Sequence, residues 1–531
     1  MAKRYTKHRI AASIVLAFSV AAGTHSSGSG SGTGSQLATG HYLSANMPMT
    51  MVHPRPDTDS PNSWAYHKNS YPGIQWRIPV SFQGGAFPFY NYTINSGPSG
   101  LYFDSSHTNT GCTDIYDLVW DNPVAGTYTI SISVTDQDGT TKTSSWSHTC
   151  GTAGWVFVDE ANGDDANPGT LASPFKTING WYKSSATDTT YSGYRVMYKT
   201  GTYNVTKLDT GFTLAGLRMD ATDYAKPYVH IIYPGESPIF NTSAAHFLFQ
   251  SQAKDAYFNV RLDDNSGQVS DPNVTDVSHI TFNTTTGRDR ITLLSHVSNM
   301  NYKSGDTNHA AYWFSNPWPV VGQYLTIRGQ CSGTNTGAII DSFTFNHVVI
   351  EDFFVGGTNI QDESPFYIKS DVQNLSMRRI EVDSANPTDL HYGTILLAGQ
   401  EQSQALDYNN IEIQYCLLWS DLAGSWRRGI TTNWVTYANT PNRNIWIQRN
   451  TIIGELDSLQ AAPWNVYVDG NFFVTNAATP WKTSAGNETD IIGSVVSNVV
   501  TTPADSALDA SSNLQGTYKT NYYGTVGREI N

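Results

Sequence analysis

The sequence predicts an all-β chain in which a short β-sandwich precedes a longer β-solenoid. Charged residues make up only 14% of the 531 residues, whereas Gly, Ser, Thr and Asn abound, as expected for strands joined by many turns. Residues 127–134 alternate strictly between polar and apolar. Farther along the chain, a unit with an apolar anchor recurs at intervals of 21 to 36 residues. This self-similarity is typical of a solenoid.

The first residues predict export. Lys3, Arg4, Lys7 and Arg9 precede an apolar run, Ile10–Ala22, which is too short to span a bilayer. We therefore expect a signal peptide over residues 1–23, followed by a Ser/Gly/Pro-rich linker over residues 24–68. The predicted location is extracellular or at the cell surface. Because no later segment has 18 consecutive apolar residues, no membrane span is expected.

The charge balance limits the possible partners. The chain has 31 basic and 45 acidic residues, a net charge of −14, and removal of residues 1–23 would make it −18. Such an acidic chain is a poor nucleic-acid binder. It would also repel an anionic polymer, which would need a local basic patch or a bridging cation such as Ca²⁺. We expect an extracellular polysaccharide as the partner, since 30 Tyr and 14 Trp offer rings for sugar stacking.

The sandwich is predicted over residues 69–151. Its clearest strand, Thr127–Val134, is followed by the turn Asp136–Gly139 and by a partner strand that begins at Thr140. Earlier strands are expected over Ile74–Val80 and Phe89–Ile94. Short strands with regular turn signals indicate two packed sheets. The turn could hold Ca²⁺ through Asp136 and Asp138, although an ordinary hairpin turn is the preferred interpretation.

This region resembles the immunoglobulin-like domains of bacterial surface and secreted proteins. The matching stretches are Tyr71–Gly73, Gly84–Phe89, Gly97–Leu101 and Ala125–Tyr128, the last leading into Val134–Asp136. The resemblance implies an immunoglobulin-like sandwich that acts as a spacer or accessory module. In an exported domain, Cys112 and Cys150 are predicted to form a disulfide. Whether Cys331 and Cys416 pair is left open.

The segment Trp155–Ile178 opens the second domain. Its strand and its loop rich in Asn, Asp and Gly resemble the N-terminal segment of many secreted right-handed parallel β-helix proteins, among them pectate-lyase-like enzymes. In those families a strand, a loop and a capping helix close the end of the solenoid. The resemblance therefore implies a right-handed parallel β-helix over residues 152–531 with an N-terminal cap.

The repeat itself is an apolar anchor preceded by Asn or His. Copies begin at His347, Asn374, Asn410, Asn444 and Asn465, which places the anchors at Val348, Leu375, Ile411, Ile445 and Val466. Weaker copies are His279–Phe282 and Tyr324–Ile327. The anchor and the residue two positions later should face the core. The Asn/His column is expected to stack in a turn, with each side chain hydrogen-bonded to neighbouring backbone.

The same register predicts an outward strip on an exposed sheet face. Successive coils place on it Val349 and Glu351, Ser376 and Arg378, Glu412 and Gln414, Trp446 and Gln448, and Tyr467 and Asp469. Two aromatic rings suit sugar stacking, and amides suit hydrogen bonds to hydroxyls. We predict substrate binding by Trp446, Tyr467, Gln414 and Gln448. The alternative is an ordinary solvated sheet face.

A lyase would need a base and a positive group that stabilises the enolate of a uronic acid. The candidates for base or neutraliser are Lys369, Arg378, Arg379, Arg427 and Arg428. The candidate Ca²⁺ ligands are Glu351, Asp352 and Asp383. The alternative for Arg378, Arg379, Glu351 and Asp352 is a set of salt bridges between coils. The dense Asp cluster of a pectate-lyase-like calcium site is missing from the coils.

Two other functions stay open. Glu351 and Glu412 lie two coils apart on the strip, roughly 10 Å between backbones, from which side chains could reach the separation of an inverting hydrolase pair. A non-catalytic glycan-binding or self-assembling surface protein would also suit the spacer domain and low charge density. The preferred hypothesis is a secreted polysaccharide-acting enzyme that cleaves a uronic-acid-containing polymer by β-elimination, ahead of hydrolysis.

Overall fold

The computed structural model describes residues 46–181, apart from 60–62 and 90, and between residues 194 and 501 chiefly the solenoid strands with some adjoining turns. Almost all regular structure in this part of the chain is β-strand; the only helices described are two 3-10 turns, η1 (Tyr66–Lys68) and η2 (Ile178–Gly180). Neither of these is long or apolar enough to cross a membrane.

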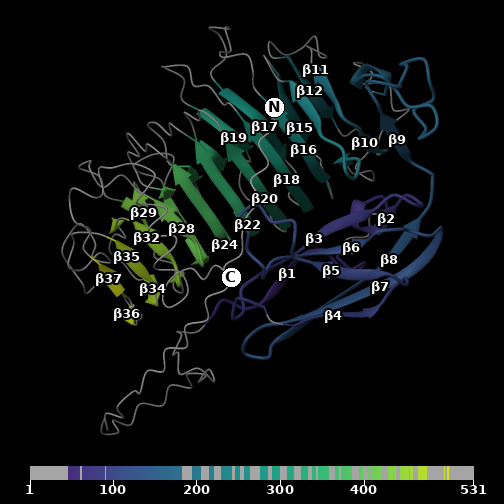
Figure 1. Ribbon diagram of the computed structural model, residues 1–531. Helices are drawn as coiled ribbons and strands as arrows, with labels where there is room; N and C mark the ends of the chain where they lie inside the picture. The colour runs from purple at the N-terminus through teal and green to yellow at the C-terminus, as the bar shows by residue number, and fades with distance from the viewer. Residues whose placement is uncertain are drawn as a thin grey trace, which may run out of the picture.

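The first domain consists of two four-stranded sheets packed face to face (Figure 1). One has the order β1-β3-β6-β5 and is antiparallel; the other has the order β2-β8-β7-β4, with β2 parallel to β8. The strands are β1 (Thr50–His53), β2 (Asn69–Ser70), β3 (Trp76–Gln83), β4 (Asn91–Ser96), β5 (Leu101–Asp104), β6 (Tyr116–Trp120), β7 (Gly126–Thr135) and β8 (Thr141–Cys150).

The alternation that predicted β7 also determines its packing. Ile130, Ile132 and Val134 are fully buried between the sheets, and the residues between them face outward. The predicted turn is a hairpin turn, because the Asp136 carboxylate accepts hydrogen bonds from the backbone N–H groups of Asp138 and Thr140. The two sheets agree with the predicted sandwich, and its immunoglobulin-like class stays a prediction.

The domain begins earlier than predicted. Residues 50–53 were expected to be linker, but they form β1, which pairs with β3. Met47 and Met49, which precede β1, and Met51, which is part of it, are all buried. Their spacing of two residues is the strand signal that the interpretation as linker missed.

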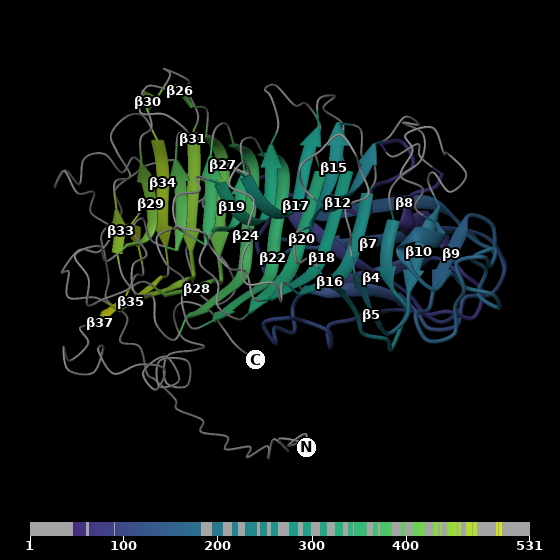
Figure 2. The ribbon, with the colours of Figure 1, turned by 90° about the horizontal axis from the view of Figure 1, so that it is seen from above.

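The second domain is a parallel β-solenoid in which each coil pairs with the next. One long, bent sheet contains β9 (Trp155–Val158), β10 (Arg195–Tyr198), β11 (Gly201–Asn204), β13 (Val229–Ile232), β14 (Pro238–Asn241), β16 (Ala256–Asp263), β18 (Arg290–Ser298), β20 (Tyr324–Ser332), β22 (Phe345–Gly357), β24 (Val372–Ser384), β27 (Tyr408–Gln414), β28 (Leu417–Trp419), β31 (Arg443–Gln448), β32 (Thr451–Ile453), β34 (Trp464–Asp469), β35 (Phe472–Val474), β36 (Val495–Val496) and β37 (Val499–Thr501). Figure 2 shows these strands side by side along the solenoid.

A second parallel sheet follows the same coils. It contains β12 (Ala215–Asp220), β15 (Ala245–Ser251), β17 (Asp276–Thr284), β19 (Asn308–Ser315), β21 (Ala338–Ser342), β23 (Phe366–Lys369), β25 (Ile395–Ala398), β29 (Arg428–Asn433) and β33 (Glu455–Asp457). A small parallel pair joins β26 (Ala405–Leu406) to β30 (Thr436–Tyr437).

The pairing register confirms the predicted repeat. Val348 pairs with Leu375, Leu375 with Ile411, Ile411 with Ile445, and Ile445 with Val466, so each interval between anchors is one coil. The weaker copy at Tyr324–Ile327 joins the same column, because Leu325 pairs with Val348. The copy at His279–Phe282 does not, since it lies in β17 of the second sheet.

The Asn/His column marks a turn, as predicted, but its partners differ. His347, Asn374 and Asn410 have φ values of 55–57°, in the left-handed region that Asn tolerates better than most residues. The described Asn side chains bond to one another: Asn410 Nδ2 donates to Asn374 Oδ1 at 3.0 Å, and Asn444 Nδ2 donates to Asn410 Oδ1 at 3.2 Å. A side-chain amide can serve the coils on both sides because it donates and accepts.

A second Asn pair, Asn450 and Asn471, is fully buried at the next turn. Asn450 Nδ2 donates to the backbone carbonyl of Ile413 at 2.8 Å, and its Oδ1 accepts from the N–H of Cys416 at 2.9 Å. This side chain satisfies backbone groups that the strands leave unpaired.

The predicted cap is present as a strand and a tight loop. The acidic loop is structural: Asp159 Oδ1 accepts from the N–H groups of Ala161 and Asn162, and Asp165 Oδ1 accepts from those of Lys176 and Thr177. In place of the expected capping helix, the described part of this segment contains only the 3-10 turn η2.

The predicted Cys112–Cys150 disulfide is not formed. Both residues are buried free thiols, as are Cys331 and Cys416. Cys150 lies at the end of β8, whereas the Cys112 thiol lies 3.8 Å from Asp352 Oδ1 in the second domain. Two cysteines in one predicted domain were therefore insufficient evidence for a pair.

We expect Asn450→Ala to lower the free energy of unfolding by about 2–4 kcal/mol, because it leaves two buried backbone groups without partners. Urea denaturation would measure this. Asn444→Ala makes the same change in the Asn/His column described above, and it should lower the free energy of unfolding by less than about 1 kcal/mol. Equal losses would show that the buried pair has no special role.

Candidate functional site between the two domains

The predicted outward strip is not exposed. Glu351, Arg378 and Glu412 are 2%, 0% and 0% exposed, because the first domain lies over this part of the long sheet (Figure 1). Strands β1 and β3 cross β20, β22 and β24. The register placed these side chains on the correct face, but the prediction that solvent or a polymer contacts them there is wrong.

Arg378 and Glu412 fasten the two domains together. The Arg378 guanidinium donates to the carbonyls of Phe82 at 2.7 Å and Gly84 at 2.9 Å, and it forms an ion pair with Glu412. Glu412 Oε1 also accepts from the N–H of Gly84 at 2.9 Å. Gly84 has a φ of 67°, and a Cβ there would lie 2.2 Å from Pro48 O, so only glycine fits this approach.

Arg379 and Asp352 make contacts of the same kind. Arg379 pairs with Asp114 of the first domain and lies 4.7 Å over the Tyr415 ring. The carboxylate of Asp352 accepts from the backbone N–H groups of Asn109 and Thr110, both at 2.9 Å. Arg378 and Arg379, predicted as base or neutraliser, and Asp352, predicted as a calcium ligand, therefore make contacts between the two domains.

The remaining strip residues lie farther along the coils. Trp446 stacks on Tyr467 with centroids 5.8 Å apart, and Gln414 Nε2 donates to Gln448 Oε1 at 2.9 Å. Trp446 is only 4% exposed, and Tyr467 is partly exposed. Their substrate-binding role stays a prediction. The side chains of Lys369, Asp383 and Arg428, and Arg427 as a whole, lie outside the described residues.

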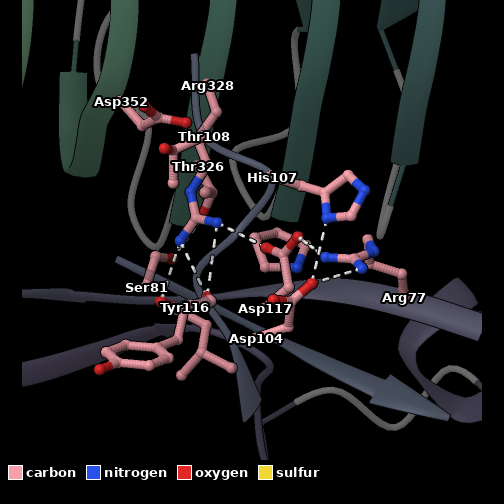
Figure 3. A network of polar contacts seen from close by, with 12 residues as sticks. Arg77, Ser81, Asp104, His107, Thr108, Tyr116, Asp117, Thr326, Arg328 and Asp352 are labelled. Atoms are coloured by element: carbon pink, nitrogen blue, oxygen red, sulfur yellow. Dashed lines mark hydrogen bonds and ion pairs between the residues drawn. The ribbon is translucent and has the colours of Figure 1, made fainter. Parts of the chain in front are cut away.

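Arg328, which the sequence analysis did not single out, occupies the centre of the interface (Figure 3). Its guanidinium donates to Glu351 at 2.6 Å, to Asp117 of the first domain at 2.7 Å, and to the carbonyl of Val80 at 3.1 Å. Burial alone would lower the pKa of Arg328, but the two carboxylates hold it above its ordinary value. Asp117 also accepts a hydrogen bond from Arg77 Nη1 at 2.9 Å, so one carboxylate links the two arginines.

A cleft of about 370 Å³ opens beside this network. The first domain contributes Arg77, His107, Asn109 and Asp117, and the solenoid contributes residues of β13, β16, β18, β20 and β22 and of the turn before β14. A smaller cavity of about 180 Å³ adjoins it and shares the lining residues Arg77, Ile232, Asn259 and Leu294. Both domains are therefore needed to form this concave surface.

His107 lies at the rim of the cleft in a defined orientation (Figure 3). Its Nδ1 is 3.1 Å from Asp104 Oδ2 and 2.8 Å from Ser106 Oγ. Because an ionised carboxylate only accepts hydrogen bonds, the contact with Asp104 places a proton on Nδ1, and Nε2 is the ring nitrogen that accepts a proton in the neutral form of the ring. Burial opposes ionisation of Asp104, yet hydrogen bonds from Ser106, Arg77 and His107 hold its pKa well below the usual range.

Asp352, which lines the cleft, and Glu351, which lies behind it, differ from Asp104. Burial raises the pKa of Asp352 to about 6, although hydrogen bonds from Asn109 and Thr110 favour the carboxylate. Burial also raises the pKa of Glu351, against the effect of Arg328. Carboxyl groups in and directly behind the cleft thus have pKa values moved in opposite directions, a pattern found at acid–base sites.

The predicted Ca²⁺ has no ready-made ligand group in the described part of the site. The residues described there include no group of three or more His, Cys, Asp or Glu side chains that could hold a metal ion. Both Asp352 oxygens already accept hydrogen bonds. The expectation of Ca²⁺ stays a prediction.

Comparisons with known proteins give only distant structural likenesses. No family model and no curated protein match the chain. A solved GH136 lacto-N-biosidase from Eubacterium ramulus is 10% identical over 65% of this chain and 68% of its own, with a TM-score of 0.38. A family 28 exopolygalacturonase from Yersinia enterocolitica is 11% identical over 86% and 99%, with a TM-score of 0.28. At this similarity neither assigns a role to a residue.

We expect Arg328→Met to lower the free energy of unfolding by about 3–5 kcal/mol at neutral pH, because it leaves Glu351 buried without its partner. The pKa of Glu351 would rise further above its unfolded value, so the loss should be larger at pH 8 than at pH 5. Urea denaturation at both pH values would measure this.

Adding Glu351→Met to that variant should restore most of the lost stability, since no buried charge would then lack a partner. Lys142→Met, at an exposed position, should cost less than about 0.5 kcal/mol. A double variant no more stable than Arg328→Met would contradict the proposed role of the pair.

Proposed function

We propose that the chain is an extracellular carbohydrate-active enzyme that binds a polysaccharide in the interdomain cleft and cleaves it by β-elimination. The observation that carries this proposal is His107. His107 lines the described cleft, its Nδ1 is held by the carboxylate of Asp104, and its Nε2 is left to face a substrate. A base oriented in this way can remove a proton from a bound sugar.

The hydrogen bonding of the other groups favours His107 as the base. Asp117 accepts from both Arg77 and Arg328, and Asp352 accepts from Asn109 and Thr110. Arg77, with a side chain 21% exposed, can still offer a guanidinium to a substrate carboxylate. A base and a cation in one cleft are two parts that β-elimination of a uronic acid requires.

Hydrolysis of a neutral glycan is the second candidate, because of the charge of the cleft. Asp117, Asp352 and Glu236 line it against two arginines, and Asp104 and Glu351 lie directly behind. This negative balance disfavours an anionic polymer. Hydrolysis would need one carboxyl group of the cleft as the proton donor and a second as the base.

Two assays distinguish these candidates. Incubation with alginate, pectate and glucuronan should produce the ultraviolet absorbance of an unsaturated sugar if elimination occurs. Release of reducing ends from neutral glycans without that absorbance would favour hydrolysis. If neither signal appears, the enzymatic proposal is wrong, and the non-catalytic glycan-binding alternative gains support.

His107→Gln should lower kcat about 10²–10⁴-fold, because glutamine can hydrogen-bond but cannot take up the proton. The melting temperature should change little, since this side chain is exposed at the rim. Tyr102→Phe, on the neighbouring part of β5 but outside the described cleft lining, is the control and should keep full activity. Unchanged turnover in the histidine variant would remove His107 from the mechanism.

A further inference from the structure

The outer face of the sheet β4-β7-β8 has an unusual composition. Alternate residues of β7 from Thr127 to Thr135 and of β8 from Thr141 to Thr149 are all Ser or Thr, and β4 adds Asn91, Thr93 and Asn95. The opposite face of these strands packs in the sandwich core through Ile132, Trp146 and their neighbours. Lys142 pairs with Val134 and so points to that opposite side.

Cross-strand register arranges these short side chains in rows. Thr127 lies opposite Thr149, Ser131 opposite Ser145, and Thr135 opposite Thr141. Neighbouring hydroxyls should therefore repeat about every 4.8 Å across the strands and 6.8 Å along them. The face lies on the side of the first domain away from the solenoid, with β1 and β3 between them (Figure 1).

Several of these groups already bond to one another. Ser133 and Thr143 join at 2.8 Å, Thr135 and Thr141 at 2.8 Å, and Asn95 Nδ2 donates to Ser133 at 2.7 Å. A hydroxyl has one donor and two acceptor positions, so each keeps further capacity directed outward. Because the rows are ordered before any ligand arrives, binding loses little side-chain entropy.

The absence of charge on this face indicates its partner. The chain as a whole carries a net charge of −14, so an exposed face without charge stands apart from the rest of the molecule. On the outer face of these three described strands there is none; Asp57 and Lys68 pair with each other at its margin, where Asp57 accepts from the N–H of Ser147. A neutral array of donors and acceptors complements a neutral array of hydroxyls.

We propose that this face, here called the hydroxyl face, docks the protein onto the surface of an insoluble neutral polysaccharide. It is separate from the cleft, and it rests on the proposed function only in taking carbohydrate as the ligand. Many weak hydrogen bonds in register with a repeating surface replace the aromatic stacking usual for a single soluble chain. Docking would hold the cleft close to polymer in the same matrix.

The test is sedimentation of the full chain with microcrystalline cellulose, chitin powder or starch granules. We expect retention of the wild-type protein on at least one of these solids. Thr129→Lys combined with Ser145→Lys should reduce the binding constant about tenfold or more, because each lysine lifts the face away from a flat surface and adds a charge that must be desolvated. The hydroxyls of Thr129 and Ser145 make no hydrogen bond with described residues, so the fold should survive the change.

Val124→Lys is the matched control, since Val124 is 64% exposed in the same domain and outside the face. It should bind like the wild type. His107→Gln should also bind normally, which separates docking from turnover in the cleft. The proposal is overturned if the wild type stays in solution with all three solids, or if the control loses binding equally. A wild-type dimer that the paired lysines dissociate in sedimentation velocity would assign the face to self-association instead.

Discussion

The arrangement of the two domains depends on the buried guanidinium of Arg328. It is 6% exposed, and its donors meet Glu351 from its own domain, and Asp117 and the carbonyl of Val80 from the other. Removal of such a charge from water costs several kcal/mol unless every donor finds an acceptor. Because two acceptors belong to the first domain, a shift of that domain by a few ångströms would leave buried donors of Arg328 without acceptors, although Glu351 would still pair with it. The position of the cleft follows from this constraint.

The same chain of ion pairs reaches the rim. Asp117 joins Arg328 to Arg77, Arg77 joins Asp117 to Asp104, and Asp104 orients His107. A side chain that is itself mostly exposed is therefore held in place by groups that are mostly buried. This explains how a short loop can present an imidazole in one tautomer without packing around the ring. It also explains why the first domain, which its sequence suggested to be a spacer, takes part in the site.

The register of the solenoid could be read from the sequence because burial imposes a period of two on each strand. The anchors at Val348, Leu375 and Ile411 are opposite one another for that reason. What covers the outward face could not be read in the same way, because a strand pattern says which side is outside its own domain and nothing about a second domain. One signal was present: Glu351 and Glu412 have arginines in adjacent coils, and charges of opposite sign in register suit a covered face as well as a solvated one. Asp104 and His107 are only three residues apart, but Arg77 comes from β3, and only the fold brings it to them.

The two sheets of the first domain present side chains of different chemistry: one face meets the solenoid with charged groups, and the other carries short neutral groups. The side of the first domain that carries the sheet β1-β3-β6-β5 meets the solenoid through ion pairs that cross the boundary, Asp117 with Arg328 and Asp114 with Arg379, and these make the contact specific and fixed. The sheet β2-β8-β7-β4 presents only short neutral groups on its outer face, which fix no single orientation. A contact built from ion pairs is demanding in geometry because an unpaired buried charge is costly, whereas hydroxyl contacts tolerate displacement by one repeat. A permanent contact between two domains needs the strict geometry of ion pairs. Adherence to a repeating surface needs the tolerance of hydroxyl contacts. One small domain can supply both kinds of contact because the outer faces of its two sheets point in opposite directions.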